Sequence, residues 1–240
     1  MQATDVIIID PSVSDYKTLI SDLSPDIPVI ILPTNGNGLQ NIAEALSGYT
    51  DLSAVHLVSH GSKGSLQIGD SPINQASLTE QTSALASISE SFAPGADLLL
   101  YGCSVASGEE GKEFVSQLAD SLNVDIAAST DRTGPLDLKG DWDLEFTDGE
   151  IESVLPFTVQ GMQDIDHCLG CIGAQAISQI TCELQGGTWD ENGRGDPAPP
   201  SNSAPVITLP TKPTVNENDT NVDIADSINI TDQNNNNQKS

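Results

Sequence analysis

The stretch AVHLVSHG, residues 54–61, is a short apolar run that ends in a histidine and a glycine. Its length and its β-branched residues favour a buried strand over a helix. Similar apolar runs lie before and after it, and segments with helical spacing separate them. Short apolar strands of this kind, without polar alternation, are typical of a parallel sheet that is covered on both faces.

The same pattern extends from residue 5 to about residue 130. The sequence predicts strands over residues 5–10, 28–33, 54–61, 97–103 and 125–130. It predicts helices over residues 14–23, 38–49, 77–92 and 109–123. Ser14 is expected to cap the first helix, and Gly48 is expected to close the second. Ser77 is expected to cap the third, with Glu80 completing a capping box. A small hairpin is expected over 65–75 and a further β excursion over 135–154.

We therefore expect an α/β fold with three layers and a mainly parallel central sheet, followed by an irregular, β-containing C-terminal tail. The expected domains are residues 1–155 for the α/β domain, 156–203 for a cysteine-containing segment and a Gly/Pro/Asn-rich linker, and 204–240 for an incomplete β repeat.

The chain of 240 residues carries 35 acidic against 8 basic residues, a formal net charge of −27. This charge disfavours nucleic acid and anionic membrane surfaces as partners. No apolar run reaches the roughly 18 residues that a membrane span needs, so no membrane insertion is expected. The start, MQATDVIIIDPS, lacks a basic region and a long apolar block, which leaves the cytoplasm, processing, or export by a signal that is not N-terminal.

Two histidines, His56 and His60, lie four residues apart in the quoted stretch. On a helix this spacing suits zinc, but Leu57 stands where the helical metalloprotease motif has glutamate. On a strand the two side chains lie roughly 13 Å apart, too far for one ion. We expect no shared metal, and we interpret His56 as a buried strand histidine.

His60 follows one apolar strand and Cys103 ends the next, so both are expected at the carboxyl edge of the sheet. A histidine beside a cysteine can serve as general base for a thiol nucleophile. The N–H groups of Gly61 and Cys103 would then face a developing oxyanion. The alternative is that Cys103 is a small buried apolar residue and His60 a loop residue. The residue types alone leave both interpretations open.

The blocks AVHLVSHG and LLLYGC resemble those of caspase-fold cysteine peptidases, the group of caspases, gingipains, separases and CHAT proteases. The wider set VHLVSHG, LLLYGCSVASGEEGKEFV, VDIAASTDRTG and GDWDLE is similar to an uncharacterised N-terminal domain family of large bacterial surface proteins, over about residues 5–155. The resemblance implies Cys103 as nucleophile, His60 as general base or acid, and an oxyanion site near Gly61. It assigns no role to His56.

Substrate preference is a separate question. In caspase-like folds the main specificity pocket lies near the same edge of the sheet, so acidic residues after the fifth strand are candidates to bind an Arg or Lys side chain. The alternative is a solvated acidic loop. The candidate substrate-binding residues are Asp131, Asp141 and Asp143.

The region after residue 156 carries a second group of metal-ligand residue types. His167, Cys168, Cys171 and Cys182 are suited to zinc, but a second close-spaced pair is missing, so a disulfide to Cys182 is the alternative. The tail resembles the opening of cadherin-like or immunoglobulin-like repeats of bacterial adhesins. Calcium is a candidate ligand there, with Asn/Asp-rich disorder as the alternative, and the candidate ligands are Asp219, Asp223, Asp226 and Asp232.

Together these features predict a secreted or cell-surface cysteine endopeptidase, at the head of a bacterial adhesin, that uses no cofactor. Its substrate is a peptide or protein, with its own linker around Arg194 as a candidate. The rival hypothesis is a catalytically silent structural or interaction cap, which would share the same fold. Nucleotide binding is disfavoured because DPSVSD, rather than a glycine-rich loop, follows the first strand.

Overall fold

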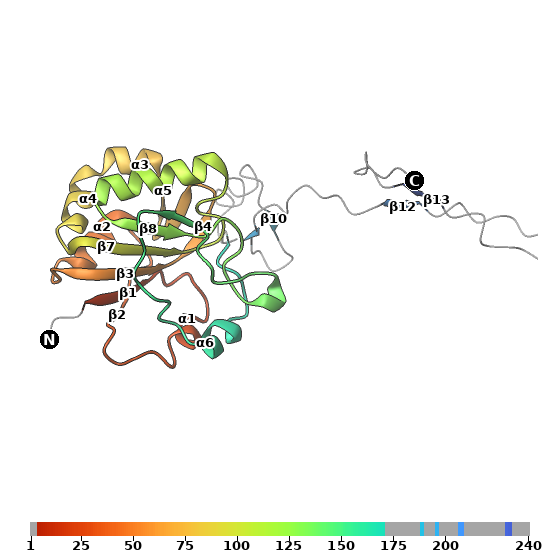
Figure 1. Ribbon diagram of the computed structural model, residues 1–240, viewed down its shortest axis with the longest axis horizontal. Helices are drawn as coiled ribbons and strands as arrows, with labels where there is room; N and C mark the ends of the chain where they lie inside the picture. The colour runs from red at the N-terminus through yellow and green to blue at the C-terminus, as the bar shows by residue number, and fades with distance from the viewer. Residues whose placement is uncertain (1–3, 171–187, 190–194, 197–205, 209–228, 232–240) are drawn as a thin grey trace, which may run out of the picture. The chain divides into compact units, whose positions relative to one another are not determined.

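The computed structural model describes residues 4–170 together with the short strands at 188–189, 195–196, 206–208 and 229–231 (Figure 1). The chain divides into two compact units, Met1–Pro197 and Ala198–Ser240. In the first unit, an α/β body holds a six-stranded sheet between two covering layers. The expected α/β class is therefore confirmed.

The sheet has the strand order β2-β1-β3-β7-β8-β9. The first five strands in this order are parallel, and only β9 runs antiparallel to its neighbour β8. Apolar residues occupy both faces of the central strands, which is why these runs lack polar alternation. The strands are β1 Asp5–Ile9, β2 Val29–Ile31, β3 Leu52–Val58, β7 Phe92–Tyr101, β8 Asp125–Ala128 and β9 Phe146–Asp148.

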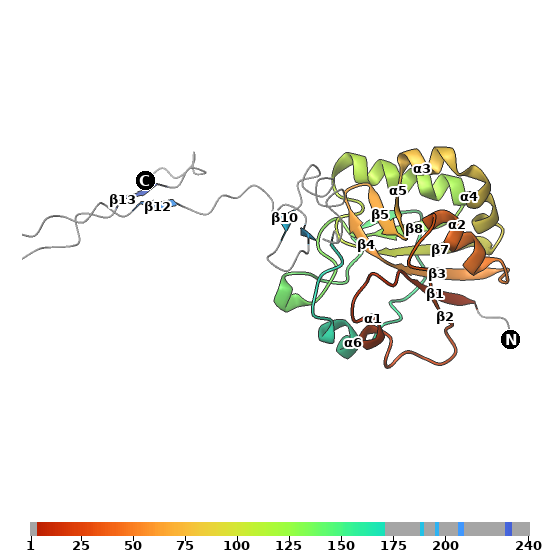
Figure 2. The same cartoon turned by 180° about the vertical axis from the view of Figure 1, so that it is seen from behind.

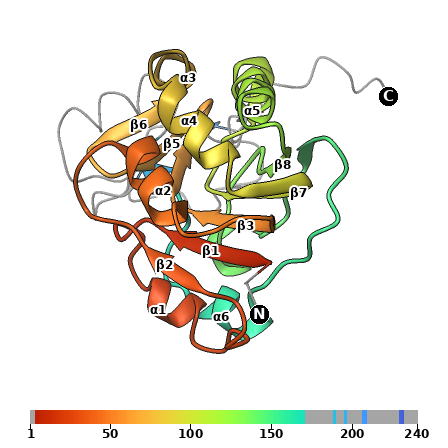
Figure 3. The same ribbon diagram turned by 90° about the vertical axis from the view of Figure 1, so that its left-hand side faces the viewer.

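Helices cover the two faces unequally (Figure 3). One face is covered by α2 Gly38–Leu46, α3 Gln75–Glu80, α4 Thr82–Ser89 and α5 Gly108–Leu122, whose apolar sides join one large core cluster. Among the described residues, the other face carries only the short helices α1 Tyr16–Leu19 and α6 Val159–Asp164, together with loops. The view from behind shows the same division (Figure 2).

The prediction of a single helix over residues 77–92 is wrong, because Gln81 interrupts the helix and separates α3 from α4. Gln81 has φ −117° and ψ 40°, outside the helical region. The capping box exists, but its cap is Asn74, whose side chain accepts from the N–H of Ala76 and of Ser77. Ser77 is the third helical residue, and its side-chain oxygen accepts a hydrogen bond from the Asn74 N–H.

Two other expected elements also differ at their ends. The helix expected over 14–23 is the single turn α1, preceded by Asp15 in the left-handed region and not capped by Ser14. The strand expected over 54–61 ends at Val58, and His60 begins a separate strand, β4 His60–Ser62. That strand pairs with β5 Ser65–Ile68, which pairs with β6 Ser71–Asn74, so the expected hairpin around Gly69 and Asp70 is present.

The α/β body continues beyond residue 155. After β9 the chain crosses the face that carries α1, and Phe157, Ile165 and Leu169 are buried in the core cluster of that face. The 3₁₀ turn Leu136–Leu138 precedes this region. No described helix is long and apolar enough to cross a membrane.

Two small antiparallel strand pairs follow in the chain. They are β10 Thr188–Trp189 with β11 Gly195–Asp196, and, within the second unit, β12 Val206–Thr208 with β13 Asn229–Thr231.

Candidate functional site

The strands that lead to His60 and Cys103 are neighbours. In the parallel pair of β3 and β7, Val58 lies beside Tyr101, and His60 and Cys103 each follow two residues later. Val58, Tyr101 and Cys103 all belong to the core cluster on the α1 and α6 face. Cys103 therefore lies on this side of the sheet. His60 is close to the same side, since its ring is 5.9 Å from that of His167 and its Nε2 is 3.3 Å from the Ser12 carbonyl oxygen.

His60 is a buried, uncharged base. Only 5% of its surface is exposed, and its Nε2 lies 3.3 Å from the Ser12 carbonyl oxygen. Its Nδ1 is buried and has no hydrogen-bond partner among the described residues. Burial, and next the neighbouring His167, lower the pKa of His60 to about 4, against the opposing effects of the Ser12 and Gly170 carbonyls and of Asp10. The imidazole is therefore neutral at physiological pH and able to accept a proton.

Cys103 is fully buried beside the end of β7. Its Sγ–H donates to the Thr133 carbonyl oxygen at 3.6 Å. The backbone beside it packs directly on the backbone that follows His60, because a Cβ placed on Gly102 would lie 3.2 Å from the Gly61 nitrogen. Glycine at both Gly61 and Gly102 therefore allows the two chain segments to touch.

This close approach aims two backbone donors at one atom. The N–H groups of Gly61 and Cys103 both donate to the carbonyl oxygen of Leu169, at 2.9 and 2.8 Å. These are the two donors that the sequence indicated for an oxyanion. Two converging N–H groups on a single carbonyl oxygen form the arrangement that stabilises a tetrahedral oxyanion in acyl transfer.

The segment that provides this carbonyl is bound on several sides. The Leu169 N–H donates to the Thr133 carbonyl oxygen at 2.8 Å, and the Leu169 side chain is fully buried. A Cβ on Gly134 would lie 2.9 Å from the Cys168 Cα, so the chain passes tightly over that glycine. Residues 168–170 thus occupy the site as a bound peptide would. Sequence reasoning missed this role of Leu169.

The three predicted acidic residues lie close together in a nearby loop. The carboxylates of Asp131 and Asp141 are brought together with that of Glu145, which the sequence did not single out, and their oxygens lie within 4.8 Å of one another. The Asp143 N–H donates to Asp141 Oδ1 at 3.0 Å. Desolvation, and then the charges of Glu145 and Asp141, raise the pKa of Asp131. Their role in binding a basic side chain stays a prediction.

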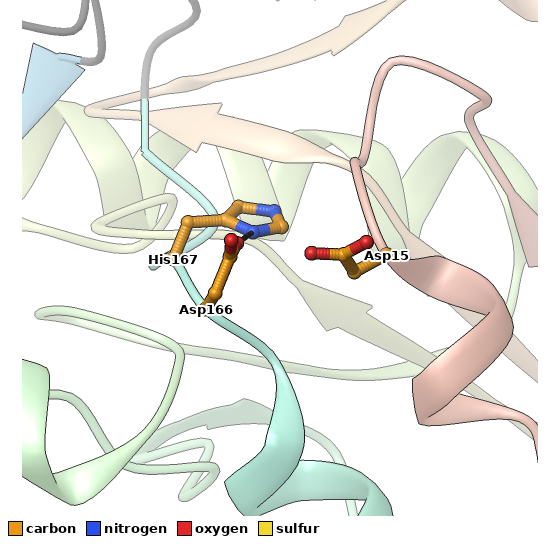
Figure 4. Close-up of side chains that lie close together, drawn as sticks. All are labelled: Asp15, Asp166 and His167. Carbon is orange, nitrogen blue, oxygen red and sulfur yellow. Dashed lines mark hydrogen bonds and ion pairs between the residues drawn. The ribbon is translucent and has the colours of Figure 1, made fainter.

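A second polar group lies beside His60. The rings of His60 and His167 are 5.9 Å apart, and the His167 Nδ1 lies 2.9 Å from Asp166 Oδ1. Figure 4 shows Asp15 and Asp166 flanking the His167 ring, and one ligand atom of each of the three residues lies within 4.8 Å of the others. Among the described residues, such groups able to hold a metal ion also include Asp131, Asp141 and Glu145, and Asp97, Asp125 and Glu152.

The predicted zinc or disulfide group is only partly within the described residues. His167 faces Asp166 and Ser14, whereas the Cys168 Sγ donates to the Leu138 carbonyl oxygen at 3.8 Å. The remaining candidates of the linker and tail lie outside the described residues: Cys171, Cys182, Arg194, Asp219, Asp223, Asp226 and Asp232.

His56 is buried in the sheet, as expected. Only 1% of its surface is exposed, its Nδ1 lies 3.2 Å from the Tyr101 hydroxyl, and the two rings stack. Burial lowers the pKa of His56 to about 4, against the charges of Asp5 and Asp97. It is a neutral core residue of the face that also carries Cys103.

Comparison with known proteins gives one relationship. No curated protein matches the sequence. The model of one protein family matches residues 6–169, which cover the central sheet from the second residue of β1 onward and end at the leucine bound in the site. This match covers more than half of the chain, so the protein belongs to the family described as "Domain of unknown function (DUF4347)".

Proposed function

We propose that the α/β body is a cysteine endopeptidase of caspase-like type, with Cys103 as nucleophile and His60 as its proton acceptor and donor. The observation that carries the proposal is the pair of backbone donors, Gly61 and Cys103, that converge on one peptide carbonyl oxygen at 2.9 and 2.8 Å. Beside a cysteine and a neutral histidine, two N–H groups that converge on one carbonyl oxygen are the donors that an acyl-transfer site uses to stabilise a developing oxyanion.

The first step needs a thiolate. The neutral imidazole of His60 accepts the proton of the Cys103 thiol, and Nδ1 is the ring nitrogen without a partner among the described residues. The thiolate sulfur then attacks the carbonyl carbon of a bound peptide bond. Negative charge develops on the carbonyl oxygen, where the two N–H groups already point. Removal of one such donor typically costs about 10²–10³-fold in rate.

The second step releases the amine. The protonated His60 returns its proton to the amide nitrogen, the carbon–nitrogen bond breaks, and the acyl group stays on the Cys103 sulfur as a thioester. Water then attacks the thioester, His60 takes one proton of that water, and the thiol is restored. The products are a carboxylic acid and an amine, which ionise in water to a carboxylate and an ammonium group, so atoms and charge balance. Apart from the attacking water, the chain supplies every group that these steps use.

The family context of the proposal comes from the sequence. The resemblance to caspase-fold peptidases and to the heads of bacterial surface proteins supports a secreted or cell-surface protease attached to an adhesin. The sheet order and the position of Cys103 beside the strand that leads to His60 are compatible with this relation. The substrate is a peptide or protein, and the chain itself is a candidate.

A catalytically silent cap remains the second candidate function, and one observation favours it. Cys103 is fully buried, and the donors beside it are already occupied by Leu169. In this alternative the segment is a permanent part of the core. The two candidates make opposite predictions for the chemistry of Cys103.

The decisive experiment compares the wild-type chain with Cys103→Ala and His60→Ala. Each chain is refolded and incubated alone and with unfolded casein, and new peptide termini are read by mass spectrometry. Each substitution is expected to slow cleavage by at least about 10²–10⁴-fold, because each removes a group that takes part in bond breaking. Cys182→Ala, a second thiol in the same chain, is the matched control and should cleave like wild type. Identical fragment patterns for wild type and Cys103→Ala would reject the peptidase and leave the silent cap.

A further inference from the structure

We infer that the substrate of this site is the chain's own Leu169–Gly170 peptide bond, which is cut in cis and leaves the Leu169 carboxylate in place as a permanent plug. The inference rests on the proposed function and names its substrate. It differs from the expectation that the linker around Arg194 is the target. Three observations on the described residues and one from the family comparison carry it.

The first observation is the position of the carbonyl. Leu169 is the residue whose oxygen receives the Gly61 and Cys103 N–H groups, and its own N–H is held by the Thr133 carbonyl oxygen. Three backbone hydrogen bonds of 2.8–2.9 Å therefore fix both sides of the Leu169 residue. The Thr133 carbonyl oxygen also accepts from the Cys103 thiol, so one atom positions the nucleophile and the bound residue together.

The second observation is the leucine side chain. It is fully buried in an apolar cluster that includes Cys103 and Ile165. A bound leucine fills this part of the site, whereas a basic side chain would be desolvated there without a partner. The pocket therefore selects an aliphatic residue before the cut, and Leu169 meets this requirement.

The third observation concerns the leaving group. In cleavage after Leu169, the nitrogen that must be protonated belongs to Gly170. The Gly170 carbonyl is one of the groups that act to raise the pKa of His60, so the imidazole lies close to Gly170, the residue that leaves. The His60 Nδ1 is buried and makes no hydrogen bond of ordinary geometry among the described residues. His60 is therefore the acid–base group beside the leaving residue.

The fourth observation comes from the family comparison. The match to the family model ends at residue 169, the residue before the inferred cut. A domain that terminates its own sequence unit by cleavage would end at the residue that it binds in its active site. The family match therefore ends at the same residue, Leu169, whose carbonyl the hydrogen bonds hold in the site.

The chemistry makes the cleavage a single event in each molecule. The Cys103 sulfur attacks the Leu169 carbonyl carbon, Gly170 leaves with the proton from His60, and water converts the thioester to the Leu169 carboxylate and restores the thiol. The new carboxylate oxygen still faces two N–H donors, and the leucine side chain still lies in the apolar core. The product therefore stays bound and blocks the site. We expect first-order cleavage with a rate constant that does not depend on protein concentration.

The test uses full-length chains purified in denaturant and refolded by dilution over a range of protein concentrations. Intact mass and N-terminal sequencing should show fragments 1–169 and 170–240, the second beginning Gly-Cys-Ile-Gly. Cleavage should fail in Cys103→Ala and should follow the same time course at every concentration. A rate that rises with concentration, or a cut at another bond, would overturn the inference.

Substitutions of the bound leucine sharpen the result. Leu169→Asp places a carboxylate in the apolar cluster and should slow cleavage by about 100-fold or more, since the charge is not paired there. Leu136→Asp is the matched control because Leu136 is 74% exposed, and it should cleave at the wild-type rate. Leu169→Met conserves volume and should cleave within about tenfold of wild type, after the new methionine. Thermal unfolding of each variant shows whether slow cleavage comes from the changed side chain at position 169 or from loss of the fold.

The outcomes separate this inference from the proposed function. Cleavage that needs Cys103 and His60 but occurs elsewhere in the chain, or only in added casein, keeps the peptidase and rejects Leu169–Gly170 as its substrate. Absence of any Cys103-dependent cleavage of the chain or of casein rejects both. Cleavage at Leu169–Gly170 that persists in Cys103→Ala rejects the cysteine mechanism and, with it, the inference.

Discussion

The two faces of the central sheet are built in different ways. One face is covered by α2, α3, α4 and α5 (Figure 3). The buried apolar side chains of this face form one large core cluster. The other face is covered by two short helices, by loops and by the segment that ends at Leu169. That second face carries Cys103, Tyr101 and the buried histidines. Regular helices cover one face, and the other, loop-covered face carries the proposed site.

The physical reason lies in the backbone. A helix satisfies its own N–H and C=O groups, so a face covered by helices offers few backbone donors to a ligand. A face covered by loops must find partners for its backbone groups, and here Gly61 and Cys103 find the Leu169 carbonyl. In the proposed function, this loop-covered face is also the one that binds the peptide. Three predictions test this division of roles.

The largest expected effect on stability comes from the helical face. Phe114 on α5 is fully buried in that cluster, so Phe114→Ala should lower the free energy of unfolding by about 3–5 kcal/mol, because it removes apolar contacts and leaves a cavity. Urea unfolding followed by circular dichroism measures the change. The proposed cleavage at Leu169 should keep its wild-type rate in buffer without urea. A changed rate in the folded variant would show that the two faces do not act separately.

The next effect is expected at the oxyanion donors. A Cβ on Gly61 would lie 2.7 Å from Val105 Cγ2 and 2.8 Å from the Cys103 carbonyl oxygen, so Gly61→Ala must move one of the two donors. The proposed cleavage should slow by about 10²–10³-fold, with some loss of stability from the clash. Gly48→Ala is the control, since a Cβ there would meet no atom within 4 Å. If Gly61→Ala cleaved at the wild-type rate, this result would argue against a role of the two N–H donors in cleavage.

The smallest effect is a dependence of stability on pH that arises on the loop-covered face. His56 and His60 both have a pKa of about 4 in the folded chain, below the value of 6.5 for an exposed histidine. The unfolded chain therefore binds more protons between these values, and stability is full above about pH 6.5 and falls as the pH falls toward 4. Each histidine should cost about 2 kcal/mol between about pH 7.5 and pH 5.

Urea midpoints at the two pH values measure this loss. His56→Gln, which keeps a polar side chain beside Tyr101, should remove about half of the pH dependence, while Cys182→Ala should leave it unchanged. A chain that becomes more stable as the pH falls would contradict this prediction. Cleavage itself should persist at about pH 5, because His60 keeps its neutral, proton-accepting form down to its lowered pKa.

Much of the fold was predictable from local patterns. The apolar runs of β1, β3, β7 and β8 identified the parallel strands, and the 3.6-residue periodicity identified α2 and α5. The residues Gly69 and Asp70 identified the hairpin. These signals succeed because burial on both faces of a strand, or on one side of a helix, acts on neighbouring residues of the chain.

The failures came at the ends of elements and at a break within one. The helix over 77–92 breaks at Gln81, and its first part is capped by Asn74, a residue that the sequence analysis had placed in the hairpin. The strand with AVHLVSHG ends before His60, and the histidine enters the small sheet of β5 and β6 instead. Propensity is a weak prior at such positions, because tertiary packing decides where an element ends.

For the site, the sequence by itself selected the types of residue: a histidine, a cysteine and the glycine beside the histidine, each at the end of a strand whose apolar character was plain. Only the tertiary structure decided that the carbonyl bound between them belongs to Leu169. That residue lies far along the chain, in a stretch with no periodic pattern of its own, and its position follows from the closing of the loop-covered face over the sheet. Local patterning encodes the strands, whereas the partner of a backbone N–H is fixed only when the whole chain has folded.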